Sequence, residues 1–175
     1  MRDGRRLAAV AWLSVGLAAS AAPAAAEGEY QLKGAFLFNF AKFVTWPGSA
    51  FGDDGELAVC LLGSDAVRDA LAATLDGRVA SDRPVRVRKL ADPGSAAGCH
   101  ILFATREAGL APGDLAATGP TLLVGESPGF ATTGGMINFV EAESRIRFEV
   151  NPAAVRAAGL SVSARLLKLA TVVGE

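Results

Sequence analysis

The stretch Leu57–Leu75, LAVCLLGSDAVRDALAATL, decides the fold class of this 175-residue chain. Its first six residues form a continuous apolar run of strand length, which is typical of a strand buried on both faces of a sheet. Gly63-Ser64-Asp65 then turns the chain, and residues 66–75 place apolar side chains at helical spacing behind an N-cap at Ser64 or Asp65. A buried strand that leads directly into a helix predicts an α/β layered domain.

Further segments of strand length support the same architecture. They cover residues 84–89, 100–104 and 121–124. Helical segments are predicted over residues 29–45 and 66–75, with a short one within 110–117. Strands that alternate with helices in this way predict a mostly parallel central sheet with helices on both faces.

The C-terminal part of the chain predicts an antiparallel hairpin. Residues 136–141 and 145–150 both alternate apolar and polar side chains, and Ala142-Glu143-Ser144 separates them as a turn. No internal repeat or long linker interrupts the pattern. Residues 27–175 are therefore predicted to form a single domain.

Two capped helices are predicted after the hairpin. Asn151 precedes Pro152 at the first helical position, and Gly159 follows the expected end of that helix. Ser163 is the N-cap predicted for a last helix over residues 164–172.

The N-terminal residues 1–26 have the pattern of a secretory signal peptide. Basic residues at the start precede the uncharged apolar run Leu7–Ala19, and the sequence Ala24-Ala25-Ala26 predicts cleavage before Glu27. Thirteen helical residues span roughly 20 Å, which is short of a ~30 Å bilayer core. We therefore expect an exported protein that is released into the periplasm without inserting in the membrane.

The charge balance argues against a nucleic-acid-binding protein. The whole chain has 17 basic and 18 acidic side chains, and removal of residues 1–26 leaves 14 and 17, a net charge of −3. Arginines cluster around Arg86 and Arg88, but they alternate with Val85 and Val87 and no aromatic residues are interleaved to stack bases. This segment is predicted to be a strand with one solvated face.

The two cysteines, Cys60 and Cys99, are predicted to form a disulfide, because an even pair in an exported chain favours a bridge. Two thiols without partner histidines cannot fill a tetrahedral zinc site, so no metal is expected. A bridge here would close a loop of roughly 40 residues, worth about 4 kcal/mol in the chain-entropy model. The only histidine, His100, is interpreted as a strand-edge residue.

The sequence Gly125-Glu126-Ser127-Pro128-Gly129 matches the nucleophile elbow of α/β-hydrolases. The residue after an elbow serine must donate its backbone N–H to the oxyanion, and Pro128 has none. No histidine follows Ser127 to act as the base. We therefore interpret Ser127 as a turn residue and expect no enzyme activity and no cofactor.

Glycines at Gly134-Gly135 precede a strand rather than a helix N-terminus, so they lack the dipole of an anion site. They are interpreted as admitting an unusual backbone or the close approach of another segment.

The first helix, YQLKGAFLFNFAKFVTWP, holds about half of the aromatic residues. Most of them share one apolar sector and are predicted to be core. Phe38 falls on the polar side, where it is solvent-exposed unless a partner or another segment covers it. We hypothesise that Phe38, with Trp46 at the end of the helix, belongs to a protein–protein surface.

The order of several segments resembles the YfiR/HmsC-like family of periplasmic proteins. These segments are KGAFLFNFAKFVTWP, LAVCLLG, GCHILFA and the long stretch LLVGESPGFATTGGMINFVEAESRIRFEVNPAAVRAAGLSVSARLLKLA. The resemblance covers residues 30–172, almost all of the expected exported chain. It implies a compact α/β fold and a disulfide between Cys60 and Cys99.

The resemblance also implies a regulatory function. It suggests a repressor that binds the periplasmic sensor region of an inner-membrane diguanylate cyclase and so lowers cyclic-di-GMP synthesis and biofilm formation. An outer-membrane, peptidoglycan-anchored lipoprotein would be a second partner, and a homodimer is expected. Candidate partner-binding residues are Phe38, Trp46, Gly134, Gly135, Arg145 and Arg147.

A small-molecule sensor, or an accessory binding protein for another receptor or histidine kinase, is the alternative function. The turn Gly63-Ser64-Asp65 leads from a strand end into a helix N-terminus, where α/β domains often bind ligands. A ligand at this turn could also tune repression.

Overall fold

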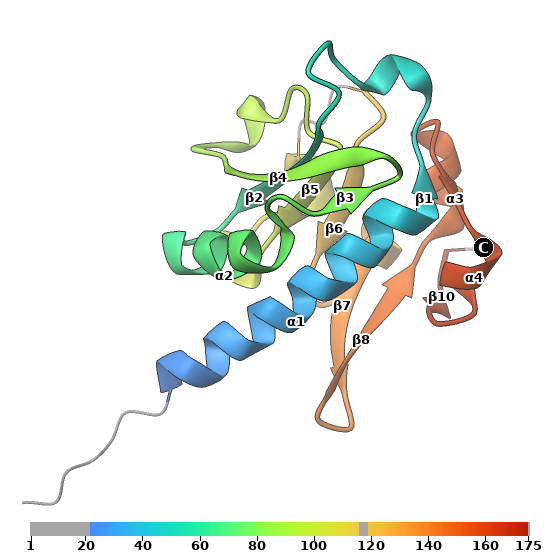
Figure 1. Ribbon diagram of the computed structural model, residues 1–175. Coiled ribbons are helices and arrows are strands. Elements are labelled where there is room, and N and C mark those ends of the chain that lie inside the picture. The colour runs from blue at the N-terminus through green and yellow to red at the C-terminus, as the bar shows by residue number, and fades with distance from the viewer. Residues whose placement is uncertain (1–21, 116–118, 175) are drawn as a thin grey trace, which may run out of the picture.

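The computed structural model describes residues 22–115 and 119–174 (Figure 1). Residues 1–21, most of the predicted signal peptide, lie outside the described residues. The central sheet of the described part has the strand order β10-β8-β7-β6-β5-β2-β4-β3. Its strands are β2 (Leu57–Leu62), β3 (Val79–Ala80), β4 (Arg83–Lys89), β5 (Ile101–Ala104), β6 (Leu122–Gly125), β7 (Ile137–Ala142), β8 (Arg145–Val150) and β10 (Thr171–Val172).

The sheet is mostly parallel, as predicted. Strands β4, β2, β5, β6 and β7 run in the same direction, while β3 and β8 pair antiparallel with their neighbours at the two sides. Every residue of β2, β5 and β6 is buried, which explains why these strands appear in the sequence as continuous apolar runs. The α/β fold class is confirmed.

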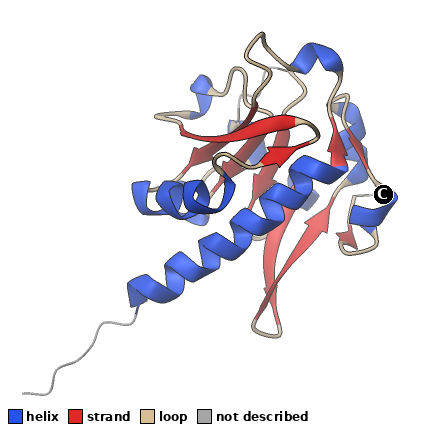
Figure 2. Ribbon diagram, viewed as in Figure 1, coloured by secondary structure: helices blue, strands red, loops and turns tan. Residues whose placement is uncertain are grey.

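The two long helices lie together on one face of the sheet (Figure 2). They are α1 (Ala22–Phe43) and α2 (Asp65–Leu75); the shorter α3 (Pro152–Ala157) and α4 (Ala164–Leu167) follow β8. From β2 to β4 the chain moves toward the β3 edge of the sheet, whereas the connections after β4, β5 and β6 lead toward the β10 edge. Because crossovers between parallel strands are right-handed, these three connections lie on the face opposite α2. Their described residues contain only single 3₁₀ turns: η2 (Pro93–Ser95), η3 (Arg106–Ala108), η4 (Pro112–Asp114) and η5 (Ala131–Thr133).

Three of the predicted helices differ from the structure. The first helix ends at Phe43 instead of residue 45, because Val44–Thr45 forms β1 and pairs antiparallel with β9 (Ser161–Val162). The last helix ends at Leu167, because the chain continues into β10 beside β8. The helix expected within 110–117 is the single turn η4, and residues 116–118 lie outside the described part. In the first two cases a partner strand remote in sequence overrides local spacing.

The predicted N-caps are confirmed by hydrogen bonds. The side chains of Ser64, Asn151 and Ser163 accept from backbone N–H groups three residues later, at 3.4, 3.0 and 3.3 Å. The predicted hairpin is also confirmed, with Ala142 paired to Arg145 across a two-residue turn. Both turn residues, Glu143 and Ser144, have positive φ, as the tight turns that match strand twist require.

Aromatic side chains join α1 to the β7–β8 hairpin. The rings of Phe36 and Phe40 contact those of Phe139 and Phe148, with centroid distances from 5.2 to 6.0 Å. Phe40 has no exposed surface, and Phe139 and Phe148 are buried. This cluster fixes α1 across the hairpin and so determines the space left between their free ends.

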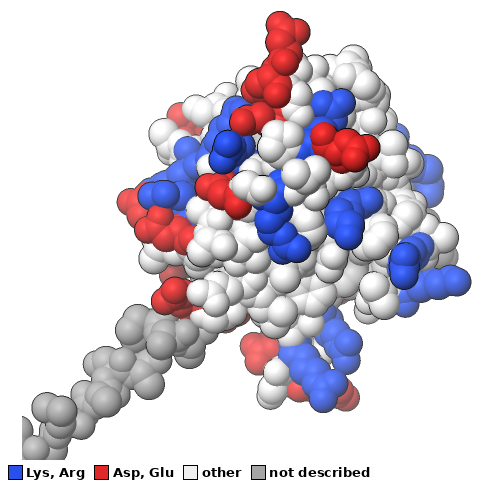
Figure 3. Space-filling model, in the orientation of Figure 1, with Lys and Arg blue, Asp and Glu red and all other residues white. Residues whose placement is uncertain are grey.

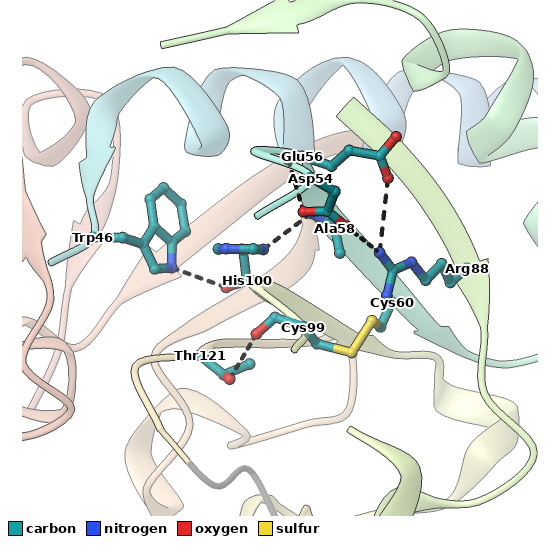
Figure 4. Close-up of a disulfide and its surroundings, with 9 residues drawn as sticks. All are labelled: Trp46, Asp54, Glu56, Ala58, Cys60, Arg88, Cys99, His100 and Thr121. Carbon is teal, nitrogen blue, oxygen red and sulfur yellow. Dashed lines mark hydrogen bonds and ion pairs between the residues drawn. A yellow bond between two sulfur atoms is a disulfide. The ribbon is translucent and has the colours of Figure 1, made fainter. Parts of the chain in front are cut away.

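The predicted disulfide between Cys60 and Cys99 is present (Figure 4). It joins the middle of β2 to the segment before β5, with 5.8 Å between the two Cα atoms. His100, next in the chain, is buried and accepts a hydrogen bond from the Ala58 N–H at Nδ1, at 3.0 Å. The bridge and this bond hold the start of β5 against β2.

Candidate functional site

A cavity of about 820 Å³ opens between the N-terminal half of α1 and the β7–β8 hairpin. Both elements extend beyond the carboxyl ends of β5 and β6, where ligands bind in open α/β sheets (Figure 1). The lining combines charged, aromatic and aliphatic side chains. Its residues are Gly28, Glu29, Tyr30, Leu32, Lys33, Arg106, Glu107, Glu126, Phe139, Val140, Glu141, Ser144, Arg145 and Ile146.

The secondary structure brings the polar residues of this cavity together. Tyr30 and Lys33 are three residues apart on α1, so their side chains lie on the same helix face. Arg106 and Glu126 follow β5 and β6 closely, and the carboxyl ends of neighbouring parallel strands meet at one edge of the sheet. Four polar side chains from three segments therefore converge at the base of the cavity.

A buried ion pair forms this base. Lys33 Nζ lies 2.5 Å from Glu126 Oε2, and the two side chains are only 7% and 5% exposed. Lys33 also pairs with Glu29, one helical turn earlier. Glu126 Oε1 accepts from the Tyr30 hydroxyl at 2.9 Å and from the Arg106 backbone N–H at 2.8 Å. Both carboxylate oxygens of Glu126 are thus satisfied, as a buried charge requires.

The network fixes the protonation of Tyr30. Burial raises the pKa of its hydroxyl well above the ordinary value, and the negative charge of Glu126 raises it further. Tyr30 therefore stays protonated, and its hydroxyl donates a hydrogen bond to Glu126. Lys33 is held between the carboxylates of Glu29 and Glu126, so the polar groups at the base of the cavity are engaged with one another.

The described residues contain no group of three or more His, Cys, Asp or Glu side chains placed to hold a metal ion. Within residues 22–115 and 119–174, none of the helices is long and apolar enough to cross a bilayer.

A sequence profile of the YfiR/HmsC-like family matches residues 30–171, which is most of the chain. The chain belongs to the YfiR/HmsC-like family. Membership supports a periplasmic regulatory role in cyclic-di-GMP signalling. No curated protein matches the chain.

Among solved structures, one similar to this YfiR/HmsC-like chain is described as a conserved domain protein from Vibrio cholerae O1 biovar El Tor. It is 10% identical in sequence with a TM-score of 0.39, and the match covers 67% of this chain. The match covers 54% of the solved chain, about half of its length.

The aromatic residues predicted to contact a partner are covered by the protein itself. Phe38 is 9% exposed, because the guanidinium of Arg78 stacks 3.6 Å from the centre of its ring. Trp46 is 8% exposed and donates from Nε1 to the backbone oxygen of His100 at 3.1 Å. Of the two ways in which Phe38 was expected to be covered, the structure shows the second, a segment of the same chain. A direct partner contact by either ring stays a prediction that their burial disfavours.

The glycines at positions 134 and 135 have structural reasons of their own in this YfiR/HmsC-like fold. Gly134 has a φ of +113°, a backbone angle that residues with a side chain rarely adopt. A Cβ on Gly135 would lie 2.2 Å from the ring of Phe130, and one on Gly125 would lie 2.4 Å from the same ring. The interpretation that these glycines admit an unusual backbone and a close approach is confirmed. A contact between them and a partner remains untested.

The arginines of β8, Arg145 and Arg147, are both exposed, and Arg145 lines the cavity. The described structure therefore does not gather the six predicted partner-binding residues on one surface. One of them borders the cavity, Phe38 lies under Arg78, and Trp46 lies beside His100.

The turn at Gly63-Ser64-Asp65 is occupied by other interactions. A Cβ on Gly63 would lie 2.8 Å from Cγ2 of Thr105, so Thr105 fills the crevice between the ends of β2 and β5. Ser64 caps α2, and Asp65 pairs with Lys89 at 2.9 Å, an interaction that lowers the pKa of the exposed Asp65 carboxyl. These contacts occupy the turn at which a ligand was expected, and the cavity described above lies beside α1 instead.

Sequence reasoning missed Tyr30, Lys33, Arg106 and Glu126 as site residues. The usable signal was an acidic residue directly after a buried strand, together with a lysine in an otherwise apolar helix face. In the sequence Glu126 belongs to the elbow-like motif, and its pairing with Lys33 across 93 positions leaves no local pattern.

Proposed function

We propose that this protein docks on the periplasmic region of a membrane-bound diguanylate cyclase and lowers cyclic-di-GMP synthesis. The observation that carries the proposal is the family match over residues 30–171. An outer-membrane, peptidoglycan-anchored lipoprotein that sequesters the regulator, and a homodimeric state, belong to the same proposal.

Docking of this kind needs only a difference in affinity for two states of the partner. A preference of about 100-fold corresponds to about 2.7 kcal/mol, which a few contacts at an interface can supply. The polar groups at the base of the cavity support a binding role because they are engaged with one another.

The test is deletion of the gene followed by measurement of cellular cyclic-di-GMP. We expect the nucleotide level to rise, and expression of the full chain to restore it. A version that lacks residues 1–26 should fail to restore it, because it would not be exported. An unchanged nucleotide level after deletion would remove the cyclase from the proposal.

Small-molecule sensing is the second candidate function, and the cavity beside α1 favours it. Its volume of about 820 Å³ falls within the range of ligand pockets, and both charged and apolar side chains line it. The test is a thermal-shift screen of the purified protein with periplasmic metabolites such as amino acids and nucleotides. Ile146→Trp should fill part of the cavity and abolish any stabilisation, with Val79→Trp on the far strand β3 as the control. A shift that persists in Ile146→Trp would contradict binding in this cavity.

A further inference from the structure

Three cationic side chains gather over two phenylalanine rings on the face that carries α1. Arg78 lies 3.6 Å from the centre of the Phe38 ring, and Lys42 lies 5.6 Å from the same ring. Lys42 is also 6.0 Å from the Phe43 ring, which Arg165 of α4 approaches to 5.7 Å. Three segments remote in sequence thus contribute to one continuous group, which we call the cationic patch (Lys42, Arg78 and Arg165).

The charges of the cationic patch are not neutralised within the described residues. None of its three side chains forms an ion pair or donates a hydrogen bond there, and all three are exposed. Arg86, Arg88 and Lys89 of β4 differ, because each pairs with an acidic side chain. On the face shown in Figure 3, Lys and Arg side chains are numerous where α1 ends and α4 lies.

The ring of Phe38 holds the Arg78 side chain of the patch in place. The Phe38 ring is buried under Arg78, and stacking at 3.6 Å restricts the guanidinium to a plane over the ring. The N–H groups of a guanidinium lie in its own plane, so a stacked arginine still presents donors at its edge. Less side-chain entropy is then lost when a carboxylate binds, which is the usual benefit of preorganisation.

We propose that the cationic patch is the docking surface for an acidic surface of a protein partner. This inference rests on the proposed docking function and names the surface that performs it. Arginine and aromatic side chains are the residue types enriched where protein interfaces gain most of their affinity. Unpaired cations in a chain with more acidic than basic residues would also orient the approach of an acidic partner.

An anionic membrane fits the patch less well. Basic segments that recognise lipid headgroups have about four to eight cations, whereas the patch has Lys42, Arg78 and Arg165 alone. Phe38 is covered and Phe43 is half-buried, so neither ring is free to insert between lipids.

The experiment reverses two charges and leaves Arg78 in place, because Arg78 covers Phe38. The double variant Lys42→Glu/Arg165→Glu is compared with Arg68→Glu/Arg156→Glu, which changes the net charge equally at a partly exposed position of α2 and an exposed position of α3. Each variant is expressed in the deletion strain, and cyclic-di-GMP is measured. Binding of each purified variant to the periplasmic segment of the cyclase is then measured at low and high salt.

We expect Lys42→Glu/Arg165→Glu to fail to lower cyclic-di-GMP and to bind about 10- to 100-fold more weakly, while the control stays near wild type. Wild-type binding should weaken as salt rises. Circular dichroism and the unfolding midpoint verify that both variants are folded. Full repression by the patch variant, in a strain where deletion does raise the nucleotide, overturns the docking surface and leaves the proposed function intact.

Two further outcomes also overturn the inference. Equal losses in the patch variant and the control would show that net charge alone matters. Binding of the wild-type protein to vesicles containing phosphatidylglycerol, lost in the patch variant, would assign the surface to lipid instead of protein. No rise in cyclic-di-GMP on deletion is a separate result, which rejects the cyclase as partner.

Discussion

Lys33 and Glu126 lie 93 positions apart in the sequence and form a salt bridge in which both side chains are more than nine-tenths buried. The pair joins the middle of α1 to the residue that follows β6. Tyr30 and Arg106 complete the hydrogen bonds of the carboxylate. The position of the cavity beside α1 therefore depends on a charge pair that the fold has removed from water.

Breaking the pair from one side should be costly. We expect Lys33→Met to destabilise the protein by about 3–5 kcal/mol, because Glu126 then keeps a buried charge without its counter-ion. Glu126→Gln in the same chain removes that charge and should recover part of the loss. Urea unfolding of the two single variants and the double variant measures the coupling. Additive losses would contradict a direct interaction.

The disulfide should contribute strongly to stability. Cys60 and Cys99 are 39 positions apart, and a bridge across a loop of this size is worth about 4 kcal/mol in the chain-entropy model. We expect Cys60→Ala/Cys99→Ala to lower the free energy of unfolding by about that amount. Reductant should destabilise the wild-type protein similarly and leave the double variant unchanged. The prediction would be contradicted if reductant left the free energy of unfolding of the wild-type protein unchanged.

Phe38 provides a test of core against interface. Because Phe38 is 9% exposed and lies under Arg78, we expect Phe38→Ala to cost about 3 kcal/mol in the free protein. The affinity for the partner, per folded molecule, should fall only to the extent that Arg78 moves when the Phe38 ring beneath it is removed. Chemical unfolding and binding measured on the same sample separate the two effects. Unchanged stability with lost binding would instead restore Phe38 as a direct contact.

Phe130 limits what can replace two glycines. A Cβ on Gly125 or Gly135 would overlap the Phe130 ring, so we expect each alanine variant to lose about 1–3 kcal/mol or more, as overpacked sites do. Gly48→Ala is the matched control, since a Cβ there meets nothing within 4 Å. Thermal unfolding compares the three. Adding Phe130→Leu to Gly135→Ala should restore part of the lost stability, because the smaller side chain reduces the overlap. If it restores none, the loss comes from overlap with the backbone instead of the ring.

His100 should make stability depend on pH. Burial lowers the pKa of its imidazole below 6.5, with Arg83 and Arg88 acting in the same direction and the Ala50 carbonyl and Asp54 opposing them. The unfolded chain then binds more protons than the folded protein between the folded pKa and 6.5, so stability should fall as pH drops through this window.

The measurement for His100 is the urea midpoint between pH 7.5 and pH 5.5. His100→Gln removes the titrating group and retains an acceptor for the Ala58 N–H, so its midpoint should fall less over this range. Equal slopes for the two proteins would show that other groups cause the pH dependence.

Local sequence features were sufficient for the longer strands and for the helix caps, but not for the two-residue strands β1, β3, β9 and β10. Continuous apolar runs predicted β2, β5 and β6, because strands buried on both faces need apolar side chains at every position. The starts of three helices were predicted from Ser64, Asn151 and Ser163. An N-cap side chain accepts from a backbone N–H only three residues later, so the signal is local in the sequence. The disulfide followed from the number of cysteines and the expected compartment.

Only the tertiary structure decided which surfaces are available for binding. Phe38 lies on the polar side of its helix, but Arg78 covers it from a turn 40 positions later, and no periodicity within α1 contains that contact. The end of α1 is set by β9, and the cavity by Lys33 and Glu126. Hydrophobic spacing and capping act within a few residues, whereas burial and charge pairing depend on which distant segments meet.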